Sequence, residues 1–165
     1  MEELKENTNS TTLPAEDEAE QIIKNHVYTA MGVGLVPVPI VDWVAMIGVQ
    51  LNMLRKLAKA YNVPFLQDKV KNLVTSLVGG TFPVSIAAPF ASLLKFIPVI
   101  GTTTGALSMS IIGGATTYAV GKVFNQHFAS GGTFLTFDPK AVKEYYNKMF
   151  QEGKEIVTKL KEDDK

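Results

Sequence analysis

The sequence contains no cysteine, which excludes disulfide bonds, thiolate metal sites and a cysteine nucleophile. Its two histidines, His26 and His127, are far apart and lack the spacing of zinc ligands. A phosphate-binding G-x-x-x-x-G-K-[ST] motif is also missing, because neither GVGLVPVP nor GTTTGALS has a lysine after its second glycine. We therefore expect no metal, no cofactor, no nucleotide hydrolysis by this chain alone and no enzymatic activity.

Charge is scarce and unevenly spread. Charged residues make up 19% of the 165 residues, below the usual quarter, and the formal net charge is zero. Asp42 is the only formal charge between Lys24 and Arg55, and Lys95 is the only one between Lys71 and Lys122. A chain without net charge has no overall field to attract nucleic acid, so we expect no nucleic-acid partner.

The N-terminal stretch MEELKENTNSTTLPAEDEAEQ is polar and acidic and has no apolar core segment, so it does not resemble a secretory signal. We predict that residues 1–13 form a disordered polar tail. The same features predict an intracellular chain, located at the cytoplasmic side of the cytoplasmic membrane or, alternatively, in the cytoplasm.

Apolar residues recur at helical spacing through most of the chain, and no segment alternates as a strand would, which predicts an all-α fold. Helices are expected over about 14–36, 41–61, 66–77, 84–96, 102–124 and 138–165. Proline-containing turns, at LVPVPIVD and FIPVIGTT, join apolar helices into two kinked hairpins. The predicted organisation is a hydrophobic helical domain over 14–128, a loop over 129–137, and an amphipathic C-terminal helix over 138–165.

The turn residues are Pro37 and Pro39 in the first hairpin and Pro98 and Gly101 in the second. Asp42 follows the first pair of prolines, where a carboxylate is favoured by the unpaired N–H groups of a helix start. We predict that the prolines reverse the chain and that Asp42 caps the next helix or complements its first turn. A ligand or proton site at Asp42 is the alternative.

Two blocks of the sequence, GLVPVPIVDWVAMIGVQLNMLRKLAKAYNVPF and LLKFIPVIGTTTGALSMSIIGGATTYAVGKVF, resemble the bacterial GTPase-associated domain of unknown function, the YcjF-like family. The residues that carry the resemblance are Pro37, Pro39, Asp42, Gln50, Met53, Leu54, Leu57, Ala58 and Tyr61 in the first block, and Lys95, Ile97, Pro98, Gly101, Tyr118 and Gly121 in the second. The resemblance spans about residues 20–128. It implies a helical, membrane-associated domain that accompanies a small GTPase, which here would be a separate protein.

The apolar blocks allow two interpretations. Residues 97–121 carry no charge and are long enough to cross ~30 Å of hydrocarbon, and residues 72–94 are also uncharged. Against insertion, Pro37 and Pro39 divide the first block into arms too short to span, and the mean hydropathy is only +0.12. A soluble bundle whose central helices are buried on all sides would have the same pattern.

The predicted C-terminal helix has an apolar stripe that repeats in steps of four and three. Its residues are Val142, Tyr146, Met149, Gly153, Ile156 and Leu160. The stripe packs on the parent bundle or serves as a docking or self-association face. Gly153 is unusual within it, because a glycine weakens a helix unless a neighbour approaches closely.

The sequence thus predicts a non-catalytic, membrane-associated helical accessory or scaffold protein. The expected partners are a lipid bilayer or an apolar protein surface, a separately encoded GTPase, and a second copy of this chain as a homo-oligomer. One alternative is a soluble oligomeric adaptor between proteins. Another is a small pore or lipid-binding element lined by the Gly/Thr-rich helix after Gly101.

Overall fold

The computed structural model describes residues 13–35, 39–79 and 102–163. They form the helices α1 (Leu13–Val33), α2 (Pro39–Ala60), α3 (Gln67–Gly79), α5 (Thr102–Ala129) and α6 (Lys143–Asp163). No strand occurs in these three ranges, and the predicted all-α fold class is confirmed. The second proline turn and the helix predicted over 84–96 lie outside the described residues.

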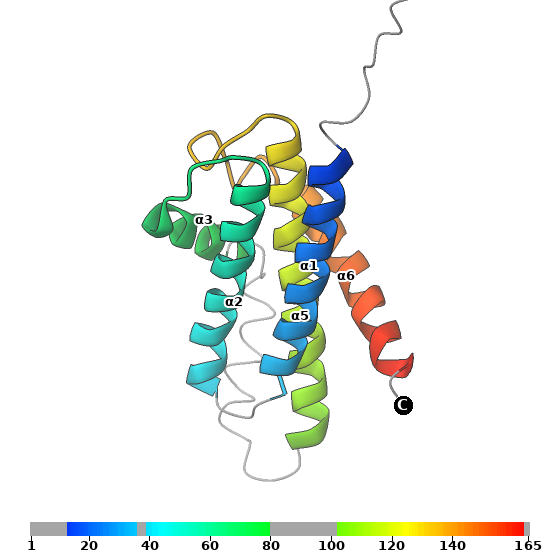
Figure 1. Cartoon of the computed structure of the whole chain (residues 1–165). Coiled ribbons are helices and arrows are strands. Elements are labelled where there is room, and N and C mark those ends of the chain that lie inside the picture. Colours follow the sequence, from blue (N-terminus) through cyan, green and yellow to red (C-terminus); the bar gives the residue numbers. More distant parts are fainter. Residues whose placement is uncertain (1–12, 36–38, 80–101, 164–165) are drawn as a thin grey trace, which may run out of the picture.

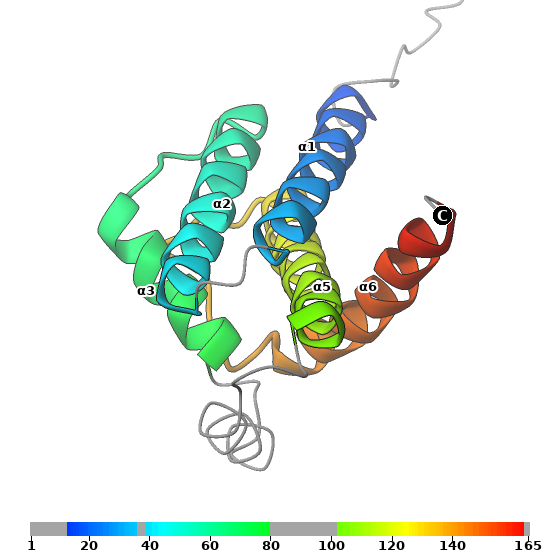
Figure 2. The ribbon, with the colours of Figure 1, turned by 90° about the horizontal axis from the view of Figure 1, so that it is seen from below.

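Helix α5 is the central element of the bundle and contacts α1, α2, α3 and α6. Figure 1 shows α1, α2 and α5 running side by side, with α3 lying across the outer side of α2 and α6 leaving the bundle on the other side. Figure 2 shows the same arrangement from below, with α5 between α1 and α6. The Gly/Thr-rich sequence after Gly101 therefore forms the axis of the fold.

Small residues in α5 let its neighbours approach closely. A Cβ added at Gly121 would lie 2.8 Å from the Ile23 side chain of α1, and one added at Gly114 would lie 2.9 Å from Val157 of α6. Larger residues at these positions would push the helices apart and leave gaps in the core. The small residues thus allow α5 to be covered on several sides at once.

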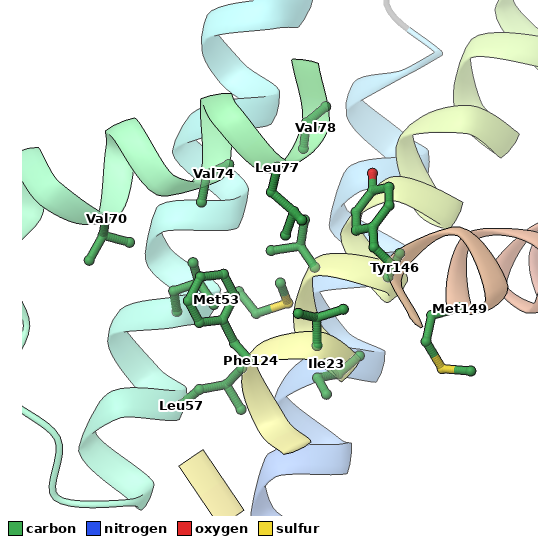
Figure 3. Packing of buried hydrophobic residues seen from close by; sticks show 14 of the residues in the cluster. Ile23, Met53, Leu57, Val70, Val74, Leu77, Val78, Phe124, Tyr146 and Met149 are labelled. Carbon is green, nitrogen blue, oxygen red and sulfur yellow. The ribbon is translucent and has the colours of Figure 1, made fainter. Parts of the chain in front are cut away.

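The core extends from α1 through α2, α3 and α5 to α6. Figure 3 shows side chains from all five helices meeting around Phe124 of α5. Beyond α5, the loop at residues 130–137 folds back, so that the Phe137 ring stacks on Phe124 with centroids 4.2 Å apart and the Phe134 ring meets Phe128 edge-on at 5.0 Å. This aromatic cluster closes the end of the bundle where α5 finishes.

The last helix begins later than predicted. Asp138 and Pro139 were expected to start it, but α6 begins at Lys143, after a series of turns. The Asp138 carboxylate accepts a hydrogen bond from the backbone N–H of Lys140 at 2.9 Å, which satisfies this donor within a turn instead of a helix. Similarly, α5 continues to Ala129, beyond the predicted end at 124.

Candidate functional site

The first half of α2 is apolar around its circumference, yet none of residues 44–49 is buried. All six are exposed or half-buried, and Val44 exposes 68% of its surface. In the second half of the same helix, Met53, Leu54 and Leu57 are completely buried. Residues 44–49, which we call the collar, are as apolar as these buried side chains but leave apolar surface exposed.

One side of the collar is fixed against α5. The Met46 methyl group lies over Gly113, where any Cβ would overlap it. The Thr117 hydroxyl also donates to the Met46 sulfur at 3.7 Å. Successive residues of an α-helix are rotated by about 100°, so Val44, two positions before Met46, points away from α5. The collar is therefore held in place on one side and open on the other.

Two further apolar residues are uncovered at the same end of the bundle: Leu35 after α1, which is 50% exposed, and Met109 in α5, which is 40% exposed. A Cβ added at Gly34 would lie 2.7 Å from the Cα of Ser110. The Ser110 hydroxyl donates to the Met31 carbonyl at 2.8 Å. These contacts join the end of α1 to the first half of α5, at the end where α2 begins (Figure 1).

This end carries almost no charge. Among the described residues 25–35, 39–54 and 102–121, Asp42 has the only formal charge. The charged last turn of α6 lies on the far side of α5 from α2 (Figure 2). Its charged side chains are Lys161, Glu162 and Asp163, and Lys159 lies just before it, so both signs are present. The collar end therefore offers apolar contact without an electrostatic preference.

The opposite end of α2 is basic. Arg55, Lys56 and Lys59 are exposed there. The Arg55 guanidinium lies 5.0 Å from the centroid of the Phe65 ring and donates to the Gln67 side chain at 3.2 Å. One helix thus connects an apolar end, where Asp42 is its one formal charge, to an end with three basic residues.

Polar side chains fasten the helices to one another between these ends. The Lys122 ammonium of α5 lies 2.7 Å from the Glu20 carboxylate of α1. The Tyr61 hydroxyl, just after α2, donates to the Asn125 side chain of α5 at 2.6 Å. Both interactions are partly exposed, and each fixes the position of a neighbouring helix on α5.

A further hydrogen bond joins α5 to α6, where the Tyr118 hydroxyl donates to the Glu152 carboxylate at 2.5 Å. Burial and this hydrogen bond raise the pKa of Tyr118 well above its ordinary value of 10.0. The phenol therefore stays protonated and keeps donating throughout the physiological pH range.

His26 is a buried residue on the inner face of α1. Its Nδ1–H donates to the Ile22 carbonyl at 2.7 Å. Burial lowers the pKa of His26 from its ordinary value of 6.5, since little water can solvate the charged ring. The hydrogen bond to Ile22 acts in the opposite direction and raises the pKa. The positive charge of Lys56 lowers it further. His26 is thus a hydrogen-bonded core residue.

The residues predicted for the turns are only partly described. Pro39 is the first residue of α2 and Asp42 the fourth, so Asp42 lies within the first turn of that helix. The role of its carboxylate as a cap or first-turn acid stays a prediction. Pro37, Pro98 and Gly101 lie outside the described residues, and their roles stay predictions.

The predicted docking stripe of the last helix faces its own bundle. Tyr146, Met149 and Gly153 are buried, whereas Val142, Ile156 and Leu160 are half-buried. A Cβ added at Gly153 would lie 3.1 Å from both the Cα and the carbonyl oxygen of Ala115, which explains the glycine in the stripe. The stripe packs on α5, and a docking role for its half-buried members stays a prediction.

The described residues contain no group of three or more His, Cys, Asp or Glu side chains that could hold a metal ion. None of the five helices in these ranges is both long and apolar enough to cross a membrane. The middle of α5 belongs to the uncharged stretch 97–121, for which insertion was one of the two interpretations, and it is covered by its neighbours: Ala115, Ala119 and Val120 have no exposed surface.

The sequence alone did not locate the collar as an exposed surface. The signal for it was present, since the start of the helix is apolar all round, but the same pattern is typical of a helix buried on all sides. Only the three-dimensional packing distinguishes residues 44–49, which are uncovered, from residues 113–120 of α5, of which all but the half-buried Tyr118 are buried.

Comparisons with known proteins give a family and a relative. A family model described as a domain of unknown function, DUF697, matches residues 2–155. The chain is also 37% identical, over 144 residues, to a protein named Magnetosome membrane protein 22 from Magnetospirillum gryphiswaldense. This match covers 87% of the chain and 74% of the relative. No solved structure matches the chain.

Proposed function

Because this chain belongs to the DUF697 family of domains of unknown function, which confirms the family resemblance noted in its sequence, we propose that it is a non-catalytic accessory or scaffold protein that associates with a membrane. The observation that carries this proposal is the uncovered, uncharged collar at one end of an otherwise well-packed bundle. A relative named as a membrane protein, similar over most of the chain, supports it. Uncovered apolar surface of this kind marks a contact with lipid or with another protein.

A scaffold role fits the distribution of polar groups. The partly exposed polar side chains Glu20, Lys122, Tyr118 and Glu152 are engaged in contacts between helices of this chain. Such groups stabilise the bundle, and their arrangement offers no nucleophile, base or oxyanion site. We propose the cytoplasmic side of the membrane as the location and a separate GTPase as a partner. The GTPase partner is motivated by the family resemblance of the two proline-containing blocks.

A vesicle flotation experiment tests the membrane proposal directly. The purified full chain is mixed with phospholipid vesicles and centrifuged through a density gradient. We expect the chain to rise with the vesicles, and in cells to sediment with membranes until detergent releases it. A chain that stays at the bottom of the gradient and in the soluble cell fraction contradicts the proposal.

The second candidate is a soluble oligomeric adaptor, and the burial of α5 favours it. Gly113, Gly114 and Thr117 face neighbouring helices of this chain, so the bundle closes its centre without help from lipid. The same packing turns these small residues away from any lumen, which argues against the pore alternative for this part of α5. Sedimentation equilibrium without lipid distinguishes the adaptor, because it requires a stable oligomer in plain buffer.

A further inference from the structure

We infer that the collar, with Leu35 and Met109, enters a single leaflet to a shallow depth and without recognising the charge of the lipid headgroups. This inference rests on the proposed membrane association and adds the contacting surface, the depth and the lipid chemistry. In this orientation the basic end of α2 lies on the aqueous side of the membrane, where a protein partner can reach it.

The rise of α2 from Val44, the first side chain described in this helix, to the buried Gln50 indicates the depth. Six helical residues rise by roughly 9 Å at 1.5 Å per residue. Apolar faces that bind at the surface of a bilayer are buried to about 5–10 Å, whereas the hydrocarbon core is ~30 Å thick. Beyond the collar, Gln50, Met53 and Leu54 are buried and the half-buried Leu51 packs against the core, so α2 turns into the bundle after residue 49. The collar matches the boundary region of one leaflet.

The charges set the lipid preference. Asp42 is the only formal charge among residues 25–35, 39–54 and 102–121, so the described part of this end has no cation to attract anionic headgroups. The chain enters α5 from residues 80–101, a sequence segment whose one formal charge is Lys95. Binding driven by apolar area depends little on salt, unlike binding driven by lysine and arginine. We therefore expect neutral and anionic vesicles to bind this end about equally.

The other end of the molecule presents the competing arrangement. It exposes Leu66 and Leu135, and its exposed charges are of both signs, with the basic residues at the end of α2 and the acids Glu16, Asp17 and Glu18 at the start of α1. Contact through the basic residues would favour anionic lipid, with affinity falling as salt is added. Binding through the collar end therefore predicts lipid contact at Val44 without dependence on headgroup charge. Binding through the other end predicts lipid contact at Leu135 and a preference for anionic headgroups.

The absence of cysteine permits a clean test with single-cysteine variants. Val44 and Leu135 are matched, because each exposes 68% of its surface and they lie at opposite ends. V44C and L135C are labelled with an environment-sensitive fluorophore, as are L35C and M109C. Emission is recorded with neutral phosphatidylcholine vesicles and with vesicles containing phosphatidylglycerol, at low and high salt. Lipids with quenchers at graded depths then report the position of each label.

We expect the labels at residues 35, 44 and 109 to shift to the blue with both vesicle types at both salt concentrations. Quenchers near the headgroups should act on them more strongly than quenchers deep in the acyl chains. The label at residue 135 should not shift. Unchanged circular dichroism and thermal midpoints of the labelled variants show that the bundle is intact, as expected at exposed positions.

Each other outcome overturns the inference. If the chain floats but only L135C shifts, and only with anionic vesicles, the basic end faces the membrane. If it floats and none of the labels shifts, the contact lies elsewhere, and the proposed membrane association survives without this orientation. If V44C shifts in buffer in proportion to protein concentration, a second copy covers the collar. If the chain does not float, the proposed function fails as well.

Substitution provides an independent measurement. V44D replaces an apolar contact by a charge and should lower the vesicle partition coefficient about tenfold or more, since the transfer of one valine side chain accounts for such a factor. L135D, which places the same charge on an equally exposed residue at the other end, should leave partitioning unchanged. Equal effects of the two substitutions would overturn the assignment.

Discussion

At the residue scale, the closest contacts between helices occur at glycines, where an atom of a neighbouring helix occupies the space that a Cβ would need. Gly153 shows this most directly, because the Cα and carbonyl oxygen of Ala115 occupy the space that a side chain would need. The backbone of α5 cannot move aside as a flexible side chain could. Close packing at this point therefore requires glycine, although glycine is a poor helix former.

G153V should lower the free energy of unfolding by about 1–3 kcal/mol, because the added side chain overpacks the contact between α5 and α6. Chemical denaturation measures this change. G48V is the matched control, since Gly48 is also helical and nothing lies within 4 Å of a Cβ at that position. Equal stability of G153V and the parent chain would show that α6 does not pack as closely as described.

His26 gives the bundle a pH dependence of defined sign. Its pKa is lowered in the folded state, so as pH falls below the ordinary value of 6.5 the unfolded chain takes up this proton first. The stability that the neutral ring contributes is complete above pH 6.5 and is lost progressively as pH falls toward the lowered pKa. Lys56 contributes in the same direction by its positive charge.

Denaturation at a series of pH values between about 7 and 5 measures this loss, in a range where most carboxylates remain ionised. The parent chain should become less stable on acidification, and H26Q should lack that part of the dependence, because glutamine does not titrate. An identical pH profile for both chains would contradict the role given to His26.

At the element scale, α6 is an integral part of the bundle. Val157 has no exposed surface and packs against Gly114 of α5, while the exposed Thr158 beside it only bonds to its own helix, at the Lys154 carbonyl. The stripe that the sequence offered as a docking face is thus mostly used within the chain.

V157A should cost roughly 1–3 kcal/mol of stability, from lost apolar burial and the cavity left beside α5. T158A, a truncation at the neighbouring exposed position, should change stability by less than about 0.5 kcal/mol. Thermal or denaturant unfolding distinguishes them. Similar small effects for both would mean that α6 is loosely attached.

The sequence predicted the helices well and their environment less well. Apolar periodicity located α1, α2, α3 and α5, and Gly153 in the apolar stripe correctly indicated a close neighbour. The start of α6 was wrong, because Asp138 and Pro139 are equally typical of a turn. The collar could not be identified as exposed, since an all-apolar helix has the same pattern whether other helices cover it or nothing does.

At the scale of the whole molecule, the bundle combines a closed centre with one open end. The core from Ile23 to Tyr146 is sealed by the chain itself, whereas residues 44–49 remain exposed or half-buried. Charge divides along the same axis, with almost none at the collar end and a basic group at the far end of α2. Such an axis orients a small protein at a boundary between lipid and water.

The emission of the one tryptophan, Trp43, tests this account most directly, because it immediately precedes the collar in sequence. When neutral phosphatidylcholine vesicles are added to the unmodified chain, we predict a shift of its emission to the blue that added salt does not reverse. Emission that stays unchanged at lipid concentrations where the chain floats would contradict the account, because the start of α2 would then remain in water.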